Sequence, residues 1–367
     1  MFLFNSKGVS LSFTHMLFNN ILTHYGLTAT DYTVTPFGSG LINGTWKISQ
    51  HQQPRYILQQ INTTVFKHPQ DIAQNIRNLG DYLQQHYPDY LFAGALPAIT
   101  GEDLYTDDEN HYYRLFPFIA NSHSVEVVHT PQQAFEAARQ FARFTHLLRH
   151  FDTSRLKITI PQFHDLQLRY QQFNEAFKKG NPERITTAAG LITYLQQQAH
   201  LVQTYEHIKN NPGYRLRVIH HDTKISNVLF DDNDKGLCVI DMDTVMPGYF
   251  ISDVGDMMRT YLSPANEEEK DVHKITVRDD FFTAIATGYL GELKQELSEA
   301  EKSQFVYAGQ FMIYMQALRF LTDYLNNDVY YGARYEGHNF IRAQNQAMLL
   351  QQYLAKEDLF NNIITTI

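Results

Sequence analysis

The feature that most constrains the fold is a polar loop enclosed by short apolar runs. Val218-Ile219 leads into a loop that carries Asp222 and Asn227, and the apolar run 228–230 follows at once. The next apolar run ends at Ile240-Asp241. Short apolar runs bounded by polar turn residues are typical of buried strands. Because the loop reverses between Asp222 and Asn227, we expect these two residues and Asp241 to point into one cleft.

These three side chains suit phosphoryl transfer. That reaction needs one group to accept the proton of an acceptor hydroxyl, and others to fix Mg²⁺ on the phosphates of ATP. We assign the first role to Asp222 and the second to Asn227 and Asp241, since Mg²⁺ is bound by few protein oxygens plus phosphate and water. The alternative is an ordinary hairpin tip, because turns favour Asp and Asn. The occurrence of all three in order between apolar strands favours the catalytic interpretation.

The rest of the chain divides into two parts of different pattern. The first is mainly strand-like, with strands expected at 32–35, 45–48, 56–61 and 112–116 and helices at 14–26 and 68–87. The second has helical spacing, with helices expected at 131–149, 165–177, 184–209, 278–297, 300–326 and 338–355. A small β-rich part before a larger helical part predicts an α+β, two-lobed protein-kinase-like fold. We place the lobes at 1–116 and 117–367.

Composition narrows the class of protein further. The 367 residues carry a formal net charge of −9, which argues against a nucleic-acid partner because such proteins usually present a basic stripe. The single cysteine excludes an internal disulfide framework. The apolar opening is interrupted at residue 5, unlike a signal peptide, and no stretch approaches about 18 apolar residues. We therefore expect a cytoplasmic protein without membrane contact, as a monomer or weak dimer.

A glycine-bearing segment lies between the first two expected strands. Glycine lets a backbone approach phosphate oxygens and turn its N–H groups toward them. We therefore assign Gly38, Ser39, Gly40 and Asn43 to nucleotide binding, although hairpin loops use glycine for other reasons. From order along the chain, the aromatic residues Phe116 and Phe118 at the lobe junction are assigned to the adenine site.

The pattern His220-x-Asp222-x-Lys224-x-x-Asn227, followed by Ile-Asp241, resembles the aminoglycoside phosphotransferase and choline kinase family. The resemblance implies that Asp222 is the base, that Asn227 and Asp241 bind Mg²⁺, and that His220 braces the loop. It also implies that Lys224 reaches the γ-phosphate of ATP. Downstream, Asp253-Val-Gly matches another family segment. That aspartate would bond the backbone of the catalytic loop, or alternatively cap a helix.

The chain departs from the kinase pattern at one place. Kinases carry a lysine on the third strand and a glutamate on the following helix, but here Gln59 stands at the lysine position and residues 71–87 contain no glutamate. Charge on the nucleotide phosphates must then be met by Mg²⁺, loop amides, Gln59 or Lys224. An inactive nucleotide-binding relative is the alternative, although the intact catalytic residues argue against it.

Four segments give a closer resemblance, to the N-acetylhexosamine 1-kinase family: residues 56–67, 222–230, 240–248 and 319–331. It implies transfer of the ATP γ-phosphate to the anomeric hydroxyl of N-acetylglucosamine or N-acetylgalactosamine. Asp243, Thr244 and Arg319 are then candidates to bind the sugar. Asp243 can instead support the site residues, and Arg319 can belong to a buried salt bridge. A kinase for choline, an aminoglycoside or homoserine remains the alternative activity.

Overall fold

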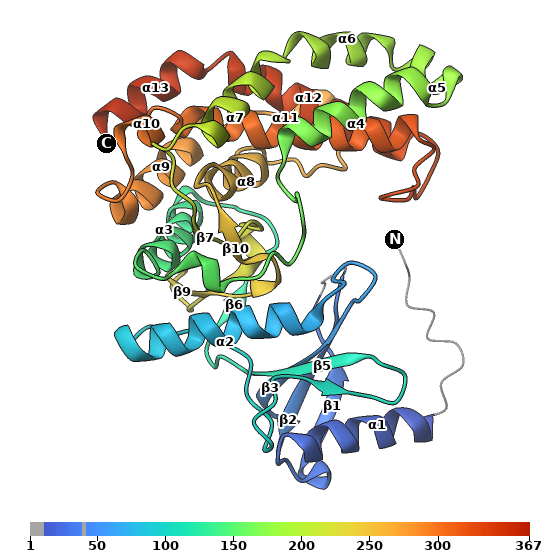
Figure 1. The fold of residues 1–367 in the computed structure, drawn as a ribbon, viewed down its shortest axis with the longest axis vertical. Coiled ribbons are helices and arrows are strands. Elements are labelled where there is room, and N and C mark those ends of the chain that lie inside the picture. The colour runs from blue at the N-terminus through green and yellow to red at the C-terminus, as the bar shows by residue number, and fades with distance from the viewer. Residues whose placement is uncertain (1–10, 39–41) are drawn as a thin grey trace.

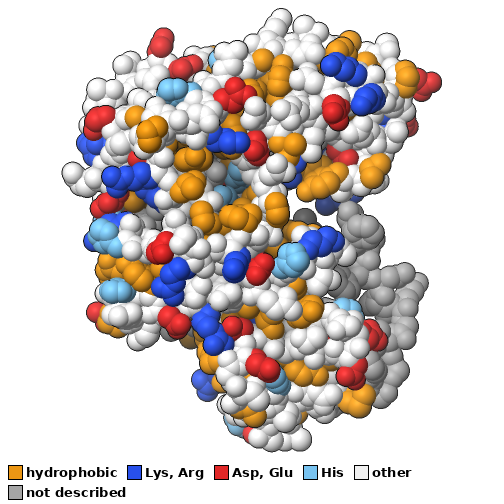
Figure 2. Space-filling model, viewed as in Figure 1, with side chains coloured by type: hydrophobic (Ala, Val, Ile, Leu, Met, Phe, Trp, Pro, Cys, Tyr) orange, Lys and Arg blue, Asp and Glu red, His pale blue; other side chains and the backbone are white. Residues whose placement is uncertain are grey.

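The structure, a computed structural model, describes residues 11–38 and 42–367. Figure 1 shows a small sheet with flanking helices at one end of the molecule and a larger helical body at the other. The predicted α+β, kinase-like architecture is confirmed. Figure 2 shows acidic and basic side chains interspersed over the face in view. In the described part of the chain, no helix has both the length and the apolar character that a membrane span requires.

The N-terminal sheet is antiparallel, and its strand order is β1-β2-β3-β5-β4. A tight turn at His51 and Gln52, both with positive φ, joins β2 to β3, as hairpins with a strong right-handed twist require. Strand β3 pairs with β5 so that Gln59 lies opposite Arg114. The strands are β1 (Tyr32–Pro36), β2 (Gly44–Gln50), β3 (Gln53–Ile61), β4 (Tyr105–Thr106) and β5 (Tyr112–Pro117).

The two faces of this sheet differ because side chains alternate along a strand. Leu58 and Leu115 face helix α1 (Leu11–His24) and form a small apolar core with Ile21. Arg114 lies on the opposite face, and it pairs there with a residue of the helical lobe, Asp243. The polar face of the small sheet therefore forms one wall of the junction between the lobes.

Helix α2 (Pro69–His86) follows the first three strands in the sequence and packs against the helical lobe. Proline in its first turn suits a helix start. Its apolar stripe packs into the large core of the helical lobe, although its place in the sequence is with the small sheet. The amide of the fully buried Asn75 donates to the backbone oxygens of Lys157 and Val245. The helix is thereby held against the segment that follows the catalytic loop.

The large lobe is organised around helix α11, which is buried along nearly its whole length. A helix that is apolar all round belongs in a protein interior. Helices α4, α8 and α12 pack against it. The helices are α3 (Pro131–Leu147), α4 (Leu166–Lys179), α5 (Pro182–Thr187), α6 (Ala189–Gln197), α7 (His200–Asn210), α8 (Ile251–Tyr261), α9 (Asp279–Leu293), α10 (Glu299–Lys302), α11 (Phe305–Leu325), α12 (His338–Leu354) and α13 (Glu357–Thr366).

Two expectations about helices were wrong. The helix predicted over 184–209 is three helices, α5 to α7, and the one over 300–326 is two, α10 and α11. Apart from Gly190 beside the first break, no proline or glycine lies near these breaks, so the sequence gives little signal of them. In the segment 216–243, the apolar runs on either side of the catalytic loop do not pair with each other. Strand β8 (Val228–Phe230) pairs with β9 (Gly236–Val239), whereas β7 (Arg217–Ile219) pairs with β10 (Met246–Gly248).

Candidate active site

Asp222 lies in the loop between β7 and β8, where two polar neighbours hold one of its oxygens. The Lys224 ammonium is 2.9 Å from Asp222 Oδ2, and the amide of Asn227 donates to the same oxygen at 3.0 Å. Neither contact involves Oδ1. Burial alone would raise the pKa of Asp222, but the charge and hydrogen bond of Lys224 outweigh it and lower the pKa. The carboxylate is therefore ionised at neutral pH, with one oxygen left to accept a proton.

Lys224 lies between the carboxylates of this loop. Burial would lower its pKa, but the charges of Asp222 and Asp241 outweigh that effect and raise the pKa. The ammonium therefore remains charged. A fixed positive charge beside the base also suits the stabilisation of a transferring phosphoryl group.

Asn227 and Asp241 meet where strand β9 ends. The backbone N–H of Ile240 donates to the backbone oxygen of Asn227 at 2.9 Å, which places the neighbouring Asp241 beside the catalytic loop. Asp241 adopts a left-handed conformation, with φ 64° and ψ 64°. Non-glycine residues in this region are uncommon and concentrate at functional sites. The three residues that the sequence pattern singled out therefore lie together.

The donor set at this point suits a divalent cation. Asn227 uses its Nδ2 in the bonds to Asp222, which leaves its Oδ1 as a ligand. Burial raises the pKa of Asp241 to about 7, and the charge of Asp243 adds to the rise. A bound cation would relieve this repulsion. Among the described residues no group of three or more His, Cys, Asp or Glu side chains forms a metal site, so a cation here needs phosphate oxygens or water as further ligands.

Helix α8 fixes the backbone of the loop through two aspartates in the same part of the chain. Asp253 accepts from the N–H groups of His220, at 3.1 Å, and His221, at 2.7 Å. Asp256 accepts from the Thr223 N–H at 2.8 Å. Burial raises the pKa of Asp253 to about 7, although both N–H groups favour its ionised form. Asp253 lies within the first turn of α8, and the residue that caps this helix is Phe250.

Two further side chains close the loop from inside. The imidazole Nε2 of the buried His220 lies 3.0 Å from the Ile240 oxygen, so it links the catalytic loop to the segment carrying Asp241. The hydroxyl of Thr244 donates to the His220 oxygen at 2.6 Å. Thr244 was a candidate to bind the acceptor, and its contacts instead favour a role in holding the loop.

Asp243, the second acceptor candidate, bridges the two lobes. Its Oδ1 forms an ion pair with Arg114 at 2.5 Å, and its Oδ2 accepts from the Asn43 amide at 2.8 Å. The side chain is 2% exposed. Both oxygens are thus engaged by the small lobe, which favours the supporting role over the sugar-binding one. Sequence reasoning did not find Arg114, because nothing in a strand pattern marks a partner so far along the chain.

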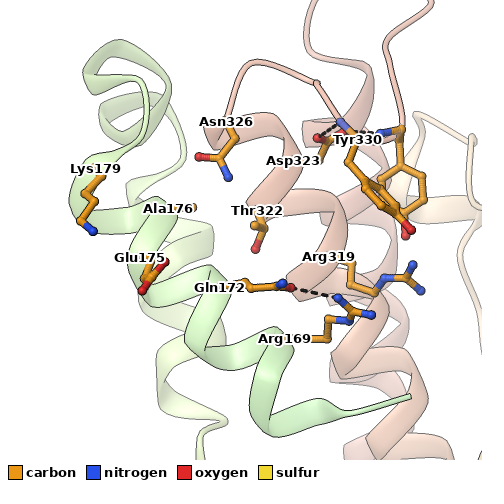
Figure 3. Close-up of a pocket in the computed structure, with 11 residues that line it drawn as sticks. Arg169, Gln172, Glu175, Ala176, Lys179, Arg319, Thr322, Asp323, Asn326 and Tyr330 are labelled. Carbon is orange, nitrogen blue, oxygen red and sulfur yellow. Dashed lines mark hydrogen bonds between the residues drawn. The ribbon is translucent and has the colours of Figure 1, made fainter. Parts of the chain in front are cut away.

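Arg319 borders a cavity of about 350 Å³ between α4 and α11. Figure 3 shows Arg169, Gln172, Glu175 and Lys179 reaching it from α4, and Arg319, Thr322 and Asp323 from α11. The guanidinium carbon of Arg319 lies 5.9 Å from the ring centroid of Phe163. The Phe163 ring stacks on His164, whose ring centroid lies 5.3 Å from that of His221, the residue before Asp222.

The remaining nucleotide candidates lie along the small sheet. Gly38 has φ +81°, and open space surrounds the position of a Cβ, while Ser39 and Gly40 lie outside the described residues. The ring of Phe118 meets that of Phe37 edge to face at 6.4 Å. Phe116, like Phe118, is half-buried. The Oε1 of Gln59 accepts from Arg114.

A chain of partly buried charges extends from the loop to α12, and sequence reasoning missed it. Arg259 pairs with Asp256 at 2.9 Å and with Glu267 at 3.0 Å, and Glu267 also pairs with Arg342. Glu267 begins a run of three glutamates at 267–269, and such a run is typical of a solvated face. Glu267 is instead a bridge between two arginines, and only tertiary packing reveals this.

The fold and the loop geometry together define a phosphotransferase of the protein-kinase-like class. Residues 33–286 match the pattern of the phosphotransferase enzyme family. This span is more than half of the chain, and the chain belongs to that family.

Solved structures agree on the fold. An aminoglycoside phosphotransferase from Alicyclobacillus acidocaldarius superposes with a TM-score of 0.63 at 11% identity, over 92% of this chain and 95% of that one. An amicoumacin kinase in complex with AMP-PNP, Ca²⁺ and amicoumacin gives 0.59 at 15% identity, over 94% and 93%. A choline kinase from Cryptosporidium parvum gives 0.56 at 14% identity, over 95% and 97%.

Proposed function

We propose that this protein transfers the γ-phosphate of ATP to the anomeric hydroxyl of an N-acetylhexosamine, which gives the sugar 1-phosphate. The observation that carries the kinase activity is the meeting of Asp222, Lys224, Asn227 and Asp241 at the lobe junction. The amicoumacin kinase whose fold is similar binds a nucleotide analogue with a divalent cation. That supports the assignment of the same ligand classes here.

Each residue then has a defined task. Asp222 Oδ1 accepts the proton of the attacking sugar hydroxyl. The sugar oxygen then bonds to the γ-phosphorus, and the bond between that phosphorus and the oxygen of ADP breaks. Lys224 offsets charge that develops on the transferred group. Asn227 and Asp241 hold Mg²⁺, which supplies positive charge to the nucleotide phosphates. Asp253 and His220 keep the loop in place.

The choice of acceptor rests on the charge of the cavity near Phe163. Three cations, Arg169, Lys179 and Arg319, line it. Of its two carboxylates, Asp323 already accepts from the N–H groups of Tyr330 and Tyr331, at 2.7 and 2.8 Å. A cationic acceptor such as choline or an aminoglycoside would be repelled there. A neutral sugar can accept hydrogen bonds from the guanidinium groups.

A panel of acceptors tests this proposal. We expect ADP to form with N-acetylglucosamine or N-acetylgalactosamine, with loss of the reducing end, and not with choline, kanamycin or homoserine. Arg319→Gln should raise the KM for the sugar by about 10-fold, since a hydrogen bond from a charged group contributes about 1.5–3 kcal/mol. Its KM for ATP should not change. Turnover with a cationic acceptor alone would refute the sugar assignment, and ATP binding without any turnover would refute the enzyme.

A further inference from the structure

The small sheet places a buried cation on its cleft face. Arg114 of β5 is 1% exposed. Its Nε and Nη2 donate to Gln59 Oε1 at 3.2 and 2.8 Å, and Nη2 also pairs with Asp243 Oδ1 at 2.5 Å. Burying a charge is costly unless it is paired. The buried guanidinium of Arg114 therefore needs an explanation, since it lies opposite Gln59, the residue in the kinase lysine position.

One nitrogen of this guanidinium has no partner. Within the described residues, Nη1 of Arg114 is buried and makes no hydrogen bond, and Asp243 Oδ1 likewise makes none beyond its ion pair with Nη2. A buried donor on a charged group that is left unsatisfied is destabilising, and such groups are rare in folded proteins. An anionic oxygen beside Nη1 would satisfy it. The unpartnered nitrogen is thus the part of Arg114 that is free for a ligand.

The surroundings indicate which ligand this is. Asp243 comes two residues after Asp241, the assigned Mg²⁺ ligand. Asn43, beside the glycine-bearing segment, donates to the other oxygen of Asp243. The guanidinium therefore lies near the segment that carries Asp241, and it shares Asp243 with Asn43.

We propose that Arg114 binds the α- and β-phosphates of the nucleotide through Nη1, in place of the missing third-strand lysine, and that Asp243 holds it as the helix glutamate does in other kinases. The cation thus comes from β5 rather than β3, at the position that pairs with Gln59. The carboxylate that pairs with the cation is Asp243, in the segment after β9, rather than a glutamate on the helix. This inference rests on the nucleotide part of the proposed function and does not depend on the acceptor.

Binding of ADP and adenosine to the full chain, measured by calorimetry with Mg²⁺, tests this directly. Arg114→Gln should weaken ADP binding about 10–100-fold, as expected for lost charged hydrogen bonds, and change adenosine binding less than 2-fold. The double variant Arg114→Gln/Gln59→Lys should recover much of the loss, because it restores the usual lysine. Arg55→Gln, an exposed change on β3, is the matched control and should bind both ligands normally.

The comparison of the two ligands separates phosphate binding from a structural role. Equal losses for ADP and adenosine, or an unchanged ADP affinity, would overturn the assignment. If Arg114→Gln does not fold, Arg114→Lys decides. It keeps the charge but loses the fork geometry, so ADP alone should weaken, by about 3–10-fold. A contrast between ADP and adenosine in a protein that phosphorylates no sugar would uphold Arg114 and reject only the acceptor.

Discussion

Replacing Asp222 with asparagine removes the proposed base while keeping the geometry around it. In the native loop, Lys224 and Asn227 both contact Oδ2. The asparagine oxygen can take that position and accept from both. Its NH₂ group then points where Oδ1 was, and it can donate to the acceptor hydroxyl but cannot take its proton.

The size of the effect follows from the reaction step that is lost. A general base contributes about 10²–10⁴-fold to the rate, which corresponds to about 2.7–5.4 kcal/mol at 1.36 kcal/mol per factor of ten. We expect the kcat of Asp222→Asn to fall by this factor. The affinity for ATP should change by less than about 3-fold, because in the proposed mechanism Asp222 makes no attractive contact with ATP. Loss of its negative charge near the phosphates only removes a repulsion.

Coupled measurement of ADP release with the best sugar acceptor, together with calorimetric ATP binding, provides the assay. Asp232→Asn is the matched control, since Asp232 is exposed in the turn between β8 and β9. It should leave both quantities unchanged. If Asp222→Asn keeps a kcat within 3-fold of the parent, the assignment of the base is wrong. A kcat loss that is matched by an equal loss of ATP affinity would instead indicate a disrupted site.

Three further changes test the framework around the site. A Cβ at Gly255 would lie 2.3 Å from a backbone oxygen of α11, so Gly255→Ala should lower the free energy of unfolding by about 1–3 kcal/mol; Gly291→Ala, where the space is open, should raise it by up to about 1 kcal/mol, and equal effects in urea titrations would contradict this packing. Glu301→Ala leaves the buried Arg217 unpaired and should cost about 3–5 kcal/mol, whereas the double variant Arg217→Met/Glu301→Leu should recover most of the loss; no recovery would count against the pair. Burial lowers the pKa of His221 to about 3, below its unfolded value near 6.5, so between pH 7 and 5 only the unfolded state takes up this proton and stability falls by about 2 kcal/mol; urea midpoints of His221→Asn should decline less over that range, and an identical decline would refute the shift.

Local pattern predicted most of the elements and the position of the catalytic loop. Asp222, Asn227 and Asp241 were recognisable because short apolar strands flank them. Residues at the ends of neighbouring strands lie close together, so these side chains were expected in one cleft. The α+β order of the chain followed from the change of apolar spacing from two to about 3.6 residues. The breaks within 184–209 were not visible, because no residue there forbids a helix.

Partners across the lobes could not be found in this way. The sequence left Asp243 as a candidate to bind a sugar or to support the site, and in the structure it pairs with Arg114 and Asn43 of the small lobe. Likewise Glu267 lies in a run that suggests a solvated face, but two arginines enclose it. Charge pairing depends on distance in space, and spacing along the chain carries no information about it.

By itself, the order of residues determined the class of fold and the chemistry of the loop, because strand and turn preferences act over a few neighbouring positions. Only the tertiary structure decided which buried charges meet. Arg114 and Asp243 are brought together by the docking of two lobes, and the cavity beside Arg319 exists because α4 and α11 pack side by side. Contacts of this kind depend on the arrangement of whole elements, which no short stretch of sequence specifies.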